Sequence, residues 1–127
     1  MVVNTHEEAF VKAFVENQRQ QRFLSFLGDP KKRVRFVREF DHLKSSFLDA
    51  RFVTRLRGTP SLSPSVYSTL RKLGAPKKCW VMGGRFDNQE KELLDALTNS
   101  GDGFALSCIA GRLAYVQSED EDLLLQR

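Results

Sequence analysis

The sequence contains few residues of the kinds that hold metals or cross-link a fold. It has two cysteines, Cys79 and Cys108, with 28 residues between them, and two histidines. This supply is too small for a disulfide scaffold, and its spacing matches no paired zinc-ligand motif. We therefore expect both cysteines to be reduced residues of the core, and we expect no metal site.

Long apolar runs are also missing. The apolar stretches span only a few residues, far short of the roughly 20 that cross a bilayer. The first eight residues contain neither a basic leader nor an apolar signal core, so the sequence predicts no export. These features predict a cytoplasmic protein that has no membrane partner.

Motifs for nucleotide binding or catalysis are absent as well. Gly83-Gly84 follows a predicted strand, but it lacks both the following Lys-Ser/Thr and the three-glycine pattern of phosphate-binding loops. Cys79 stands in an apolar run, which argues against a nucleophile. We assign no catalytic residue and no cofactor. A small hydrolytic or transfer enzyme remains a third possibility.

Phenylalanine, in contrast, is abundant. The chain has 127 residues, ten of them Phe, and its apolar share of 41% is typical of a globular protein. This length fits one domain, 1–127, and one ordinary core. The sequence therefore predicts a single domain with an aromatic-rich interior.

Charge is distributed unevenly along the chain. Residues 1–78 hold 16 Lys and Arg against 7 Asp and Glu, whereas residues 79–127 hold 4 against 9. The excess is +9 in the first part and −5 in the second. Such asymmetry indicates either a polyanionic or acidic partner for the first part, or attraction between the two parts within the fold.

Residues 1–75 are expected to be mainly helical. Thr5 to Glu8 read as a capping box that starts a first helix, which bends or restarts within residues 17–22. Gly28 ends that helical segment, Asp29 caps the next helix, and Pro30 takes its first position. Residues 45–57 support either a short helix or an apolar flap, and a short helix after a loop at 58–64 is expected to run through Leu70 and end at Gly74.

Residues 76–127 are expected to form strands with one inserted helix. The run 79–82 is typical of a buried strand, and Asp87 is placed to cap a helix over 88–98 that buries Leu93, Leu94 and Leu97. Residues 104–109 and 113–117 predict a hairpin, and 123–126 a last strand. The predicted fold is α+β, in which three to four N-terminal helices pack on a mostly antiparallel sheet of three to four strands.

The candidate site lies in the helix that begins at Pro30. Lys31, Lys32 and Arg33 crowd its first turn, where the helix dipole favours negative charge, so the helix start is a candidate anion-binding corner. The face opposite its apolar arc is basic. The residues proposed to bind an anion or partner are Lys31, Lys32, Arg35, Arg38 and His42.

The leading hypothesis is a non-catalytic binding or regulatory module that recognises an acidic partner through this basic face. The alternative is a nucleic-acid-binding protein that contacts the phosphate backbone, its footprint extended by Arg51, Arg55, Arg57, Arg71, Lys72, Lys77 and Lys78. A module that binds a protein also predicts an exposed apolar patch rimmed by charge, around Phe47, Phe52 and Val53. A basic face that is merely solvated is the simplest interpretation of the same pattern.

Overall fold

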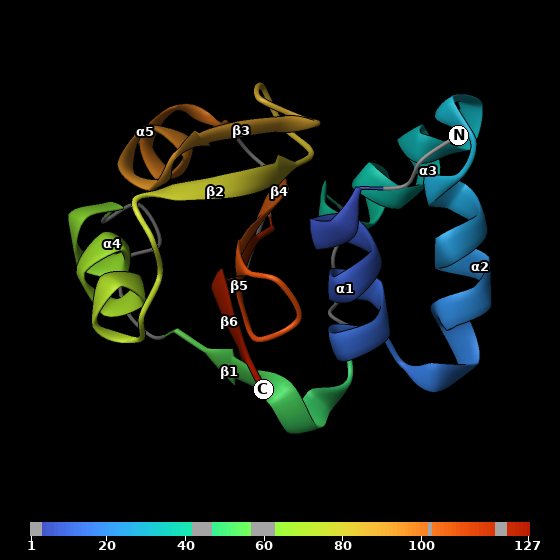
Figure 1. Ribbon diagram of the computed structural model, residues 1–127, viewed down its shortest axis with the longest axis horizontal. Helices are drawn as coiled ribbons and strands as arrows, with labels where there is room; N and C mark the ends of the chain where they lie inside the picture. Colours follow the sequence, from blue (N-terminus) through green and yellow to red (C-terminus); the bar gives the residue numbers. More distant parts are fainter. Residues whose placement is uncertain (1–3, 42–46, 57–62, 102, 119–121) are drawn as a thin grey trace.

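The computed structural model describes residues 4–41, 47–56, 63–101, 103–118 and 122–127; the side chains of 39–41, 63 and 64 are not described. Within these ranges the chain forms an α+β fold (Figure 1). Its elements in order are α1 (Thr5–Phe14), α2 (Asn17–Leu27), α3 (Pro30–Asp41), a 3-10 turn (Ala50–Phe52), β1 (Val53–Arg55), α4 (Ser63–Lys72), β2 (Lys78–Met82), β3 (Gln89–Glu92), α5 (Leu93–Asn99), β4 (Phe104–Ile109), β5 (Leu113–Gln117) and β6 (Asp122–Gln126).

The described strands form one antiparallel sheet in the order β1-β6-β5-β4-β2-β3. The α+β class with helices N-terminal is confirmed, but the prediction of three to four strands was too low, because the described residues alone form six. The two unpredicted strands are the edges. β1 has three residues and β3 reads Gln-Glu-Lys-Glu, so neither shows an apolar period, and each is held by hydrogen bonds to its neighbour, β6 or β2.

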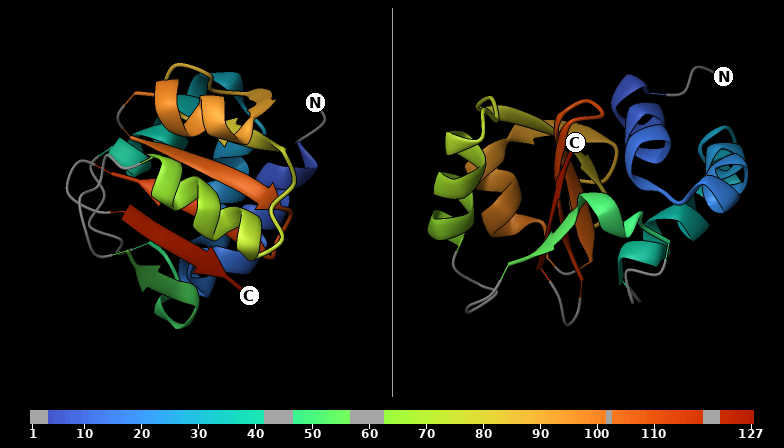
Figure 2. Two further views of the ribbon diagram at one scale, coloured as in Figure 1. Left: turned by 90° about the vertical axis from the view of Figure 1, so that its left-hand side faces the viewer. Right: turned by 90° about the horizontal axis from the view of Figure 1, so that it is seen from below.

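Helices cover both faces of the sheet. α1, α2 and α3 pack on one face, and α4 and α5 pack on the other (Figure 2, right). Alternating residues of each strand point to opposite faces, as in β5, where Ala114 and Val116 join the first layer and Leu113 and Tyr115 the second. We call the two interiors the α1–α3 core and the α4–α5 core. Seven of the ten phenylalanines belong to the α1–α3 core or pack against it.

The helical first part largely follows the sequence prediction. α1 begins at Thr5, but its cap is Asn4, whose Oδ1 accepts from the His6 and Glu7 amides at 2.8 and 3.3 Å. Asn4 takes this role because it has the extended backbone that an N-cap requires. A restart is present, but it lies before the predicted range of 17–22, because α1 ends at Phe14 and α2 runs without a break from Asn17 to Leu27. Gly28 ends α2 and Pro30 opens α3, as predicted.

The helix predicted over 88–98 was wrong in its first half. Asn88 has a φ of +66°, and Gly83-Gly84 lie in the turn of a β2–β3 hairpin, so that helix α5 begins only at Leu93. Gly84 is required there, because a Cβ would lie 2.5 Å from the Ser100 carbonyl oxygen at a φ of +71°. Asp87 therefore caps no helix. Leu93 and Leu97 are buried as predicted, whereas Leu94 is 45% exposed.

The C-terminal strands are confirmed, with β4 and β5 at the predicted bounds and β6 one residue longer than predicted. The register of β4 against β5 shifts between Ser107 and Ile109, so that Cys108 is the extra residue of a bulge.

The predicted exposed apolar patch was wrong. Phe47 is buried in the α1–α3 core, its ring stacked on Phe23 at 5.2 Å between centroids, and Phe52 and Val53 are half-buried against the same core. Guanidinium groups cover Phe52, with Arg51 and Arg127 at 5.1 and 4.8 Å from its ring centroid. For residues 45–57 the sequence left a short helix and an apolar flap as alternatives. The described part, residues 47–56, contains a 3-10 turn and a short strand.

None of the described helices combines the length and the apolar character that a membrane span requires.

Candidate functional site

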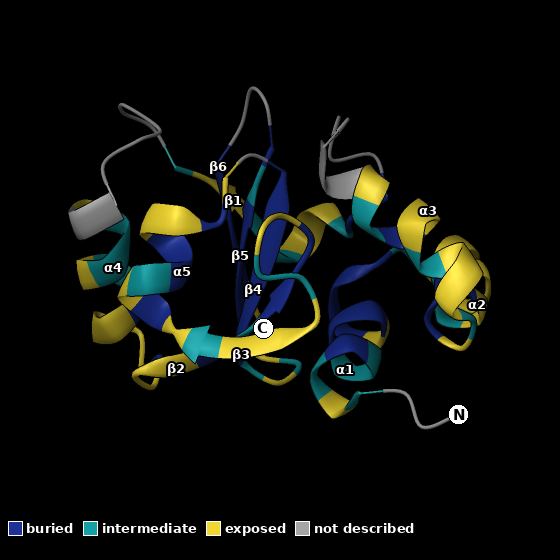
Figure 3. Cartoon of the chain, turned by 90° about the horizontal axis from the view of Figure 1, so that it is seen from above, coloured by how far each residue is buried: buried dark blue, intermediate teal, exposed yellow. Residues whose placement is uncertain are grey.

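Four of the five residues proposed as the site lie on the exposed side of α3. Lys31, Lys32, Arg35 and Arg38 are all exposed, and the outer surface of α2 and α3 faces away from the sheet (Figure 3). The fifth, His42, lies outside the described residues. We call these four exposed side chains the α3 basic face.

These cations are exposed and form no ion pair with a carboxylate whose side chain the structure describes. The ion pairs found among the described side chains involve none of the four. Val34, which is 56% exposed, lies among them on the same helix. The α3 basic face is therefore an exposed, uncompensated positive surface with respect to the side chains that the structure describes.

The amides of the helix start are already occupied. The Lys31 amide donates to Asp29 Oδ1 at 2.9 Å, and the amides of Lys32 and Arg33 donate to the Asp29 carbonyl oxygen at 2.9 and 3.0 Å. Asp29 thus caps α3 as predicted. An anion at the predicted corner would have to displace its carboxylate, so the basic side chains, and not the backbone amides, are the available anion contacts.

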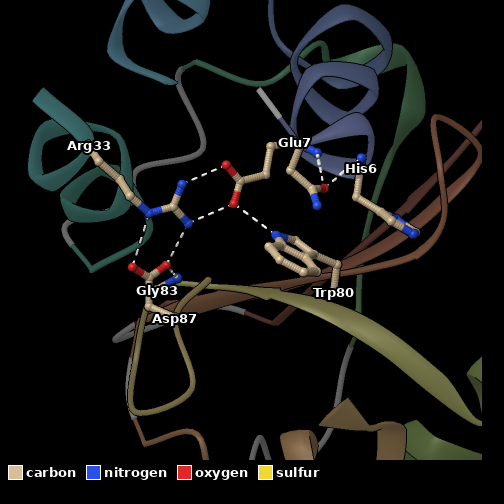
Figure 4. A network of polar contacts seen from close by, with 7 residues as sticks. His6, Glu7, Arg33, Trp80, Gly83 and Asp87 are labelled. Carbon is tan, nitrogen blue, oxygen red and sulfur yellow. Dashed lines mark hydrogen bonds and ion pairs between the residues drawn. The ribbon is translucent and has the colours of Figure 1, made fainter. Parts of the chain in front are cut away.

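Arg33 behaves differently from its neighbours, because its side chain turns inward (Figure 4). Its NH1 and NH2 donate to the two carboxylate oxygens of Glu7 at 2.5 and 2.6 Å. Its Nε and NH2 also donate to Asp87, at 3.1 and 2.8 Å. The planar guanidinium, with five donors in a fixed fork, is suited to bind two carboxylates at once.

Each carboxylate has a further donor. The indole Nε1 of Trp80 donates to Glu7 Oε2 at 2.8 Å, and the Gly83 amide donates to Asp87 Oδ1 at 2.7 Å. Glu7 is only 2% exposed, so its charge depends on these partners. We call Glu7, Arg33, Trp80, Gly83 and Asp87 the Arg33 network. It joins α1, α3, β2 and the β2–β3 turn.

The network favours the charged form of Arg33. Burial alone would lower the pKa of Arg33, but hydrogen bonds and charge from Glu7 and Asp87 outweigh it and raise the pKa above its ordinary value. Because every oxygen of both carboxylates accepts at least one hydrogen bond, neither group is placed as a free general base. The Arg33 network therefore serves as a structural contact that holds α1, α3, β2 and the β2–β3 turn together, and we call this contact the clamp.

The clamp determines which side of α3 faces water. At about 100° per residue, Lys31, Arg35 and Arg38 lie roughly 140–160° around the helix from Arg33. With Arg33 held against α1 and the β2–β3 turn, these three must point outward. The exposed fractions agree with this geometry, since Phe36, next to Arg35 in sequence, is fully buried.

Several of the residues that the nucleic-acid alternative added to this face lie apart from it. Arg71 and Lys72 belong to α4, on the opposite side of the sheet, and Lys77 and Lys78 follow that helix. Arg51 pairs with Asp49 at 2.6 Å. Arg55 lies in the edge strand β1, and Arg57 is outside the described residues. The cations of α4 and of the segment that follows it are consequently separate from the α3 basic face.

The charge asymmetry was also interpreted as attraction between the two parts of the chain within the fold, and one ion pair among the described residues shows such attraction. Arg33, from the basic first part, pairs with Asp87 from the acidic second part. The remaining ion pairs of the described residues lie within the first part. Among the described residues, the ion pair between the two parts therefore uses Arg33 and none of the cations of the α3 basic face.

Glu7, Arg33 and Asp87 were not predicted to act together. A signal was present, because Glu7 lies three and seven residues before Phe10 and Phe14, and Arg33 lies three before Phe36. Each charge therefore falls on the apolar arc of its helix, where a partner of opposite sign is required. Their pairing depends on how the helices pack, which the sequence alone does not give.

In the part of the chain that the structure describes, no three His, Cys, Asp or Glu side chains gather as a possible metal site. Comparison with protein-family models, with curated proteins and with solved structures finds no match for this chain. The site is therefore interpreted from its own geometry.

Proposed function

We propose that this protein is a non-catalytic binding module that recognises an acidic partner through the α3 basic face. The observation that carries the proposal is the contrast between neighbouring cations of one helix, α3. Arg33 is fully engaged by two carboxylates, whereas Lys31, Lys32, Arg35 and Arg38 project into water with no ion pair to a described carboxylate. Such a surface attracts and orients negatively charged molecules.

A compact contact fits this face better than a long one. A phosphate-backbone footprint needs cations spread along a continuous path, because each neutralised phosphate adds to affinity. Here the cations of α4 are separated from α3 by the whole sheet (Figure 1). This separation favours an acidic protein segment over an extended nucleic acid.

The test is the binding of a fluorescein-labelled peptide of alternating Glu and Ser, followed by fluorescence polarisation. We expect the double variant Lys31→Glu/Arg35→Glu to weaken binding by at least about tenfold, and we expect binding to fall steeply between about 50 and about 200 mM salt. The matched control is Lys72→Glu/Lys77→Glu, which makes the same change of charge on the other side of the sheet. It should stay within about twofold of the parent protein.

Three results would overturn the proposal. The first is a parent protein that does not bind the peptide at low salt. The second is an equal loss in both double variants, which would assign binding to net charge alone. The third is tighter binding to a DNA duplex than to the peptide, lost in the α3 variant, which would support the nucleic-acid alternative.

A further inference from the structure

The two cysteines, far apart in sequence, face each other in the sheet. β2 and β4 are antiparallel neighbours, and their register pairs Trp80 with Ser107, Val81 with Leu106 and Met82 with Ala105. One further step along the same register places Cys79 opposite Cys108. Both side chains belong to the α4–α5 core, so they point to the same face of the sheet.

Two cysteines opposite each other in this register would meet the geometric requirement of a disulfide. Residues directly opposite on antiparallel strands have Cα atoms about 4.5–5.5 Å apart. Disulfides bridge Cα atoms separated by about 4.4–6.8 Å. The bulge of β4 falls at Cys108, where pairing with β5 is interrupted, and such a break lets the backbone adjust locally.

Both thiols are free and buried. Burial, and then the neighbouring Cys108 and Glu90, raise the pKa of Cys79, and burial raises the pKa of Cys108 to about 12. The effect of Cys108 on the pKa of Cys79 agrees with the register, because both indicate that the two sulfurs lie close together. Since the thiolate is the reactive form, the closed fold protects the pair, and reaction requires local opening of the layer that covers it.

We propose that Cys79 and Cys108 form an internal thiol–disulfide couple that a small disulfide such as oxidised glutathione converts to a β2–β4 cross-link. One cysteine thiolate attacks a sulfur of the oxidant, which breaks its S–S bond and releases one glutathione thiolate. The second cysteine thiolate then attacks the protein-bound sulfur of the mixed disulfide and releases the second. The protein loses two electrons and two protons, and two molecules of reduced glutathione carry them away.

The disulfide would hold strand β2, which contributes to the Arg33 network, in place against β4. β2 carries Trp80, and the β2–β3 turn carries Gly83 and Asp87. Joining β2 to the central strand β4 therefore stabilises the surface on which α3 is held. The inference depends on the positions of the two cysteines in the sheet and not on the α3 basic face, so it stands or fails independently of the proposed function.

The experiment treats the full chain with oxidised glutathione, blocks the remaining thiols and maps tryptic peptides by mass spectrometry. Cleavage separates residues 79–85 from residues 92–112, each of which contains one cysteine. We expect a single species in which these two peptides are joined, from a monomeric protein. We also expect its melting temperature to be higher by about 10 °C than that of the reduced protein.

Dithiothreitol should reverse both changes, and the single variants Cys79→Ala and Cys108→Ala should lose the joined peptide and the thermal shift. Two free thiols after prolonged treatment, in buffer and in dilute urea, would overturn the proposal. So would glutathione retained on one cysteine, or a disulfide between two chains.

Discussion

The two faces of the sheet are built differently. Beneath α1, α2 and α3 the aromatic core is crossed by a charged network, in which Glu7 is buried and Arg33 bridges it to Asp87. Beneath α4 and α5 the interior is apolar, and a buried pair, Tyr115 and Asp122, is its main polar feature among the described residues. One face adds directional contacts to its apolar packing, and the other depends mainly on apolar packing.

The difference teaches what each kind of contact does. Apolar burial is non-directional, so it stabilises α5 without selecting one rotation of the helix very sharply. A guanidinium that donates two hydrogen bonds to each of two carboxylates requires one geometry. Removal of one partner of a buried ion pair strongly lowers the stability of the fold. We infer that the Arg33 network fixes the rotation of α3, and hence which of its cations face water.

The largest expected effect is that of Arg33→Ala. It leaves Glu7 buried without its cation, so we expect a loss of about 3–5 kcal/mol in the free energy of unfolding, measured by urea denaturation. The matched control is Arg35→Ala, two residues away on the exposed side, which should change stability by less than about 0.5 kcal/mol. Similar losses in the two variants would show that Arg33 is not clamped.

A double variant sharpens this result. Glu7→Gln/Arg33→Met removes both buried charges of the pair, so it should be more stable than Arg33→Met alone. If the second substitution adds a further loss instead, the two side chains do not act as a pair.

On the apolar face, Leu93→Ala is expected to lower stability by about 2–4 kcal/mol, because Leu93 is fully buried and the truncation leaves a cavity. Its neighbour Leu94 is 45% exposed, and Leu94→Ala is the control, with an expected change of less than about 0.5 kcal/mol. Equal losses of stability in the two variants, measured by thermal or urea unfolding, would contradict the assignment of Leu93 to the buried side of α5 and Leu94 to its exposed side.

Trp80→Phe tests the donor to Glu7. It removes the Nε1–H that lies 2.8 Å from Oε2, and we expect a loss of about 1.5–2 kcal/mol in the free energy of unfolding. In a Glu7→Gln background the loss should fall by about half, because the indole then donates to a neutral amide. A loss unchanged by that background would attribute the effect of Trp80 to packing alone.

The smallest effect is expected at Asp122. Burial raises the pKa of Asp122, although the hydrogen bond from Tyr115 opposes this, and its Oδ1 has no hydrogen-bond partner in the described structure. Because the folded pKa is raised, the stability contributed by protonated Asp122 is present below the unfolded pKa of about 3.9 and is lost as pH rises through the folded value.

Asp122→Asn should therefore stabilise the protein by about 1 kcal/mol at pH 7, and the gain should shrink as the pH approaches about 4. Urea denaturation at several pH values measures both the gain and its slope. A variant that is less stable than the parent at pH 7 would contradict the interpretation that the buried, ionised carboxylate of Asp122 lowers the stability of the fold.

The parts of the fold that short-range signals determine were predictable. The turn between α2 and α3 follows from Gly28, Asp29 and Pro30, and the β4–β5 hairpin from alternating apolar residues around a short turn. The edge strands were not predictable in the same way. β3 is polar throughout, and only its pairing with β2 makes it a strand.

The candidate site was predictable in part. The exposed positions of Lys31, Lys32, Arg35 and Arg38 follow from helical periodicity, whereas their binding role remains a proposal. Arg33 was predicted only as one of three cations in the first turn of the helix, because its inward contacts depend on how α3 packs against α1 and the β2–β3 turn. Asp87 was interpreted as a cap, since the tertiary contact that engages it lies 54 residues away in sequence.

The side-chain Nε–H exchange of the arginines, measured by nitrogen-15 NMR at neutral pH and assigned with Arg33→Lys, tests the rotation of α3 most directly. The predicted result is a protected Arg33 Nε–H that exchanges at least about tenfold more slowly than those of Arg35 and Arg38. Equal exchange at the three residues would contradict the inward position of Arg33, and with it the outward basic face that the proposed function requires.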